Sequence, residues 1–104
     1  MPSDLKRVAD AVIRATNGVE VTLLHRPSDE SALDAFWCLQ DRMHQLLAHI
    51  KDHPWKVAML REMYPELTGT VVGVLSRVNR TPFSQNAAVK RACTTINESL
   101  MELQ

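Results

Sequence analysis

The chain has 104 residues, of which 45% are hydrophobic and 23% are charged. These fractions are ordinary for a globular protein and argue against disorder, and the length suits one domain, residues 1–104, rather than two. Twelve basic residues balance twelve acidic ones, whereas dedicated nucleic-acid-binding proteins usually carry a basic excess. Because only three glycines are present for hairpin turns, the composition favours an all-α fold, a small bundle or irregular array of four to five helices.

The sequence shows neither a secretory signal peptide nor a membrane span. The N-terminal segment MPSDLKRVAD lacks the apolar stretch of a signal peptide, and no run approaches the ~18 apolar residues of a membrane span. We therefore expect a cytoplasmic protein without a membrane partner. Cys38 and Cys93 form no CxxC pair, so both are expected to be free, reduced thiols.

A first helix is predicted over about residues 4–17, with Ser3 as its N-cap and Gly18 as its stop. The following segment, residues 19–25 (VEVTLLH), is rich in β-branched residues and predicts a short extended segment. It is either a connector lying against the core or a strand that pairs with residues 70–75 or with a second copy of the protein. The connector is favoured because isolated strands are marginally stable.

The most apolar stretch is a predicted central helix over residues 29–52, DESALDAFWCLQDRMHQLLAHIKD. Ser28 can cap it, and His53-Pro54 ends it. On a helical wheel its apolar residues span an arc of roughly 200°, about twice what one core contact needs. Such a helix must be covered from two sides, by its own chain or by another, and we interpret the surplus as a protein-binding face. Self-association would cover it, and a heterologous partner could use the same face. The expected interface residues are Phe36, Trp37, Leu39, Met43, Leu47 and Ile50.

Three further segments follow the central helix. A short helix opens at Pro54 and ends before Pro65, because proline disfavours helical geometry in the residue before it. Residues 66–78 have helical spacing, although the composition TGTVVGVL also suits a strand, so helix and strand both stay open. A last helix is predicted from Ser84, as its N-cap, through about residue 103.

No residue pattern indicates catalysis. His49 and His53 are four residues apart, but no third metal ligand is fixed beside them. Cys38 has no cationic cluster or helix N-terminus that would make its thiol reactive. The motifs GxSxG, GxGxxG and the P-loop are absent. The sequence therefore predicts a protein that is not an enzyme and uses no metal or cofactor.

One alternative function is that of a small DNA-binding protein. Residues 55–93 can be divided into three helices, and the stretch LREMYPELTGTVVGVLSRVNR (residues 60–80) superficially resembles the first two helices of Myb-like or helix-turn-helix domains. Gln85, Asn86 and Lys90 would then lie near the start of a recognition helix. The neutral overall charge and the long turn over residues 80–83 argue against it. The candidate DNA-contacting residues are the local basic excess of Arg77, Arg80, Lys90 and Arg91.

The leading expectation rests on a resemblance as well as on the central helix. In size, in mostly helical layout, in the long helix carrying AFWCLQDRMHQLLAHI and in its lack of catalytic motifs, the chain resembles the small bacterial quorum-sensing anti-activators that bind a LuxR-type transcription factor. The resemblance covers the general plan of the chain rather than one motif. It implies a dimeric protein that occupies a regulator's own dimerisation surface and prevents DNA binding. We therefore expect a non-enzymatic homodimer that sequesters another protein through the apolar face of its central helix.

Overall fold

The computed structural model describes residues 2–24, 29–51 and 53–103. Within these ranges the chain forms helices and no strand, so the all-α prediction is confirmed and the segment over residues 66–78 is helical. The elements are α1 (Pro2–Leu24), α2 (Asp29–Ile50), α3 (Trp55–Met63), α4 (Leu67–Asn79), the 3-10 turn η1 (Pro82–Gln85) and α5 (Ala87–Glu102).

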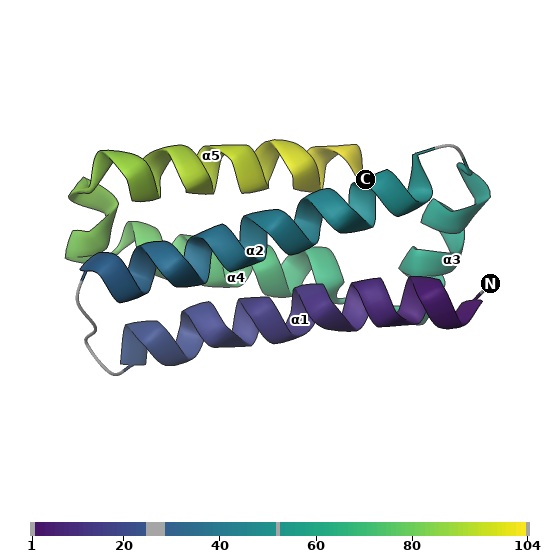
Figure 1. Ribbon diagram of the computed structural model, residues 1–104, viewed down its shortest axis with the longest axis horizontal. Coiled ribbons are helices and arrows are strands. Elements are labelled where there is room, and N and C mark those ends of the chain that lie inside the picture. The colour runs from purple at the N-terminus through teal and green to yellow at the C-terminus, as the bar shows by residue number, and fades with distance from the viewer. Residues whose placement is uncertain (1, 25–28, 52, 104) are drawn as a thin grey trace.

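The four longer helices α1, α2, α4 and α5 lie side by side as an elongated bundle, and the short helix α3 lies at one end (Figure 1). Helices α1 and α4 run in one direction, and α2 and α5 run in the other. Helix α1 packs on α2 and on α4, and α2 also packs on α5. The order around the bundle is therefore α1–α2–α5–α4, and α3 carries the chain diagonally from α2 to α4.

The core is built from apolar residues that recur every three or four positions along each helix. Helix α2 is covered on two sides by its own chain, by α1 and by α5. Its apolar arc is therefore wide because it contacts two neighbouring helices at once. The α2 residues in this core, all 0–5% exposed, are Ala32, Phe36, Leu39, Met43, Leu46 and Ile50.

The predicted stop at Gly18 and the predicted extended segment over residues 19–25 are wrong, because α1 continues as a helix to Leu24. Val19 is 1% exposed and extends the buried stripe of α1 by another turn. Burial of this apolar face outweighs the weak preference of β-branched residues for extended backbone and the cost of a glycine within a helix. Position 25 and the predicted cap Ser28 lie outside the described residues.

The predicted start of the last helix at Ser84 is also wrong. The chain first makes the 3-10 turn η1, in which the Ser84 hydroxyl donates to the Thr81 carbonyl oxygen at 2.9 Å. The N-cap of α5 is Asn86, whose side-chain oxygen accepts from the backbone N–H groups of Ala88 (2.9 Å) and Val89 (3.4 Å). Asparagine and serine are both good N-caps. Because Ser84 lies within η1, the first residue able to cap α5 is Asn86, two positions later.

Candidate protein-binding site

The structure divides the six residues of the predicted central-helix interface into two groups. Leu47 is half-buried at the edge of the core, and the Trp37 side chain is 50% exposed. In the folded chain Trp37 and Leu47 are therefore the most accessible of the six to an interface on α2, and Ile50, although largely buried, lines the same groove as Leu47. The other four are no more than 5% exposed and pack against the protein's own helices, namely Phe36, Leu39, Met43 and Ile50.

Trp37 and Leu47 both lie along the line where α2 meets α5. A small groove of about 270 Å³ beside Trp37 is lined by Gln40 of α2 and by residues of α5 that include Thr95. A second groove of about 750 Å³ contains Leu47 and also reaches Thr95. The two grooves therefore adjoin and form one surface, which we call the α2–α5 face. Its defining residues are Trp37, Gln40, His44 and Leu47 of α2 with Arg91, Thr95 and Glu98 of α5.

Three features of the α2–α5 face suit a binding surface. Ala88 and Ala92 of α5 line the groove beside Trp37, so small side chains leave room next to a large aromatic one. The side-chain oxygen of Gln40 is buried and accepts no hydrogen bond from any described residue. A buried acceptor without a donor costs about 1–3 kcal/mol, so a donor supplied by a bound molecule would be stabilising. Exposed tryptophan beside a groove is also the residue type that most often anchors protein interfaces.

The other exposed large apolar side chains are dispersed over several helices. Trp55, 56% exposed on α3, already has local contacts: its ring centroid is 5.9 Å from that of His53, and the Lys56 Nζ atom lies 5.7 Å from it. Trp55 lines neither groove of the α2–α5 face. It therefore offers a matched tryptophan outside the candidate site. The remaining members of this group are Val21, Leu24, Met63, Val72 and Met101.

The structure does not bring the four candidate DNA-contacting residues together. Arg77 forms an ion pair with Glu20 of α1, so it lies on the α1–α4 side of the bundle. Arg91 lines the α2–α5 face, on the opposite side. Arg80 and Lys90 are exposed, at the end of α4 and on α5. A basic surface that contacts one duplex would need these cations on the same side.

The helix-turn-helix interpretation of residues 55–93 is not supported by the geometry either. Helices α4 and α5 run antiparallel within the bundle (Figure 1), whereas the two helices of that motif cross at about 90–120°. The side-chain oxygen of Asn86 caps α5 by accepting from the backbone N–H groups of Ala88 and Val89. It is therefore not free to contact a base edge.

A further groove, of about 650 Å³, lies between α1 and α2 and was missed by the sequence analysis. Arg7 and Arg14 of α1 and Arg42 of α2 line it together with the exposed thiol of Cys38. The expectation that no cationic cluster accompanies Cys38 is corrected by this groove, because α1 supplies Arg7 and Arg14 and α2 supplies Arg42. The signal was the placement of Arg7 and Arg14 two helical turns apart, although nothing in the sequence shows which helix packs beside them.

The described part of the chain has no cluster of His, Cys, Asp and Glu side chains that could hold a metal ion. In the same residues, no helix has both the length and the apolar character that crossing a bilayer requires. Both cysteines are free, and burial raises the pKa of the Cys93 thiol. No family model matches the sequence, and neither the curated proteins nor the solved structures include a significant match to the chain.

Proposed function

We propose that this protein is a non-enzymatic regulator that binds another protein and sequesters it, and that the partner docks on the α2–α5 face. The observation that carries the proposal is Trp37, a half-exposed aromatic side chain beside a groove that also holds the unpartnered Gln40 oxygen. A partner covering this face would bury Trp37 in the manner of an interface anchor and could donate to Gln40.

The α2–α5 face is also complementary to itself, which supports the homodimer expected from the sequence. Thr95 lines the groove that holds Gln40 and the groove that holds His44, so it lies level with the middle of α2. Consider a two-fold axis that crosses α2 at this level, perpendicular to the helix. It places each residue of α2 in one copy opposite the α2 residue of the second copy that lies equally far from the axis on its other side. Three complementary pairs then form between copies: Trp37 with Leu47, Gln40 with His44, and Arg91 with Glu98.

The size of the face is sufficient for a specific complex. The molecule measures 39 × 21 × 18 Å, so one long side of it offers roughly 700 Å², close to the ~800 Å² per partner of a standard interface. A second copy and a different protein would occupy the same surface, so the dimer and the partner complex exclude one another. A LuxR-type transcription factor, which the resemblance implies, is the first partner to test.

The test of partner binding compares the tagged wild-type protein with Trp37→Ala and Trp55→Ala in affinity capture from a nuclease-treated native lysate. We expect one stoichiometric protein with the wild type and with Trp55→Ala, and its loss with Trp37→Ala. If both tryptophan variants retain the same protein, the α2–α5 face is not the docking site.

The dimer is tested by sedimentation of the charge-reversal variants Arg91→Glu and Glu98→Arg. Each single reversal places like charges opposite each other in the proposed dimer and should weaken self-association, whereas the double reversal should restore it. Equal association of all four proteins would contradict the proposed pairing.

A further inference from the structure

The groove between α1 and α2 combines an uncharged floor with cationic walls. Its small lining residues are Ala11, Ala15 and Gly18 of α1 and Ala35 of α2, which leave the hollow between the two helices. Its described lining contains three arginines and no carboxylate. A hollow of this length, roughly 20 Å from Arg7 to Thr22 along α1, is a channel along the surface rather than a closed pocket.

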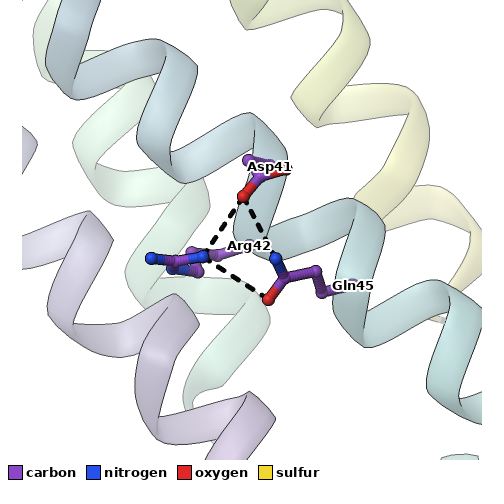
Figure 2. A network of polar contacts seen from close by, with 3 residues as sticks. All are labelled: Asp41, Arg42 and Gln45. Carbon is purple, nitrogen blue, oxygen red and sulfur yellow. Dashed lines mark hydrogen bonds and ion pairs between the residues drawn. The ribbon is translucent and has the colours of Figure 1, made fainter.

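The arginines are placed at regular intervals and on both walls. Arg7 and Arg14 are seven residues apart, so they project from α1 about 10 Å apart along its axis. Neither makes an ion pair with any residue of the described ranges. Arg42 extends from α2, where its guanidinium contacts Asp41 (3.2 Å) and the Gln45 side-chain oxygen (3.5 Å), as Figure 2 shows.

Asp41 offsets only part of this positive charge. Its carboxylate also accepts from the Gln45 amide at 3.1 Å, its side chain is 64% exposed, and it is not among the groove's lining residues. The contacts with Asp41 and Gln45 hold the Arg42 guanidinium in place without filling the groove. The guanidinium groups of Arg7 and Arg14 make no ion pair with the described residues, so both are available to a ligand.

We propose that this groove binds an acidic helix of a partner protein, with two carboxylates seven residues apart on the docked side of that helix. The repeat of an α-helix places such carboxylates about 10 Å apart, which matches the spacing of Arg7 and Arg14. Small side chains on the same side of the helix fit over the alanine and glycine floor. One small anion cannot reach both arginines at once. Because this groove and the α2–α5 face flank α2 on different sides, the inference does not depend on the proposed function.

The test uses the full-length protein and a synthetic helical peptide of about 15 residues, with two glutamates seven positions apart above a stripe of alanines. A control peptide carries glutamine at both positions. Binding is measured by calorimetry, and the rate of Cys38 alkylation by iodoacetamide reports occupancy, since Cys38 is exposed in the groove while Cys93 is buried and serves as the internal reference.

We expect the acidic peptide to slow alkylation of Cys38 and to bind more weakly as salt is raised. The double variant Arg7→Gln/Arg14→Gln should bind it about tenfold more weakly. The control variant Arg80→Gln/Lys90→Gln removes the same charge from exposed residues outside the groove and should bind normally, as should Trp37→Ala.

Three results would overturn the inference. The first is equal protection of Cys38 by the glutamine peptide, and the second is an equal loss of affinity in the control variant. The third is tighter binding of a short DNA duplex than of the peptide at the same three arginines, which would identify the groove as a nucleic-acid site. Circular dichroism of each variant confirms that it is folded before binding is compared.

Discussion

Phe36 and Trp37 are adjacent aromatic residues of α2, and replacing each by alanine should have different consequences. The Phe36 side chain is 1% exposed, so its removal loses both the burial energy and the packing around the resulting cavity, about 3–5 kcal/mol of unfolding free energy. Trp37 is 50% exposed and adjoins an open groove, so about half of that cost, roughly 2 kcal/mol, is expected. Only Trp37→Ala should remove the proposed docking anchor.

The two variants are compared by urea unfolding followed with far-ultraviolet circular dichroism. For a domain of this size the free energy of unfolding falls by about 1.5 kcal/mol per molar urea. Phe36→Ala should therefore lower the midpoint by about 2–3 M and Trp37→Ala by about 1 M. A larger loss for Trp37→Ala than for Phe36→Ala would show that α2 presents the other aromatic residue to the core, and the reasoning about the α2–α5 face would fail.

Three smaller perturbations test other parts of the structure. Gly18→Ala should raise the free energy of unfolding by about 0.5–1 kcal/mol, because Gly18 lies within α1 and an added Cβ atom meets nothing within 4 Å. If the helix stopped at this residue, chemical denaturation would instead show a lower free energy of unfolding. Asn86→Ala should lower the free energy of unfolding by about 1 kcal/mol and Ser84→Ala by less, since only Asn86 caps α5. A greater loss of thermal stability in Ser84→Ala than in Asn86→Ala would contradict the observed cap. The pKa of His49 is lowered, mainly by burial and also by Lys56, so the His49 imidazole binds a proton more readily in the unfolded chain than in the folded one. The free energy of unfolding should therefore fall as the pH drops below about 6.5, and an equal fall in His49→Gln would exclude His49 as the cause.

The fold class was predictable because the chain has only three glycines and because apolar residues recur every three or four positions over most of its helices. The end of α1 was not, since the β-branched residues from Val19 onward favour extended backbone locally and only the packing of Val19 into the bundle makes them helical. The start of α5 was missed for a related reason. Ser84 and Asn86 are both good caps, and the choice depends on the 3-10 turn η1, which has no periodic signal.

The candidate site was only partly predictable from sequence. The width of the apolar arc on α2 correctly indicated contacts on two sides, but a helical wheel does not show whether those contacts come from the same chain. Phe36 and Trp37 are 100° apart on the wheel, and only the positions of α1 and α5 make one buried and the other half-exposed. The groove that holds Arg7, Arg14 and Arg42 needs two helices to pack together, so the spacing of Arg7 and Arg14 within α1 shows that they share a side of that helix but not that Arg42 of α2 lies beside them.

The most direct test of the proposed docking face is the solvent accessibility of Trp37 in a complex. The variant Trp55→Phe leaves Trp37 as the sole tryptophan, so acrylamide quenching of its fluorescence reports on the α2–α5 face alone. The measurement is made on dilute protein and again with the captured partner or at concentrations where the protein self-associates. The proposed function predicts that quenching of Trp37 falls sharply when either complex forms. Unchanged quenching in a complex that sedimentation shows to be present would contradict it.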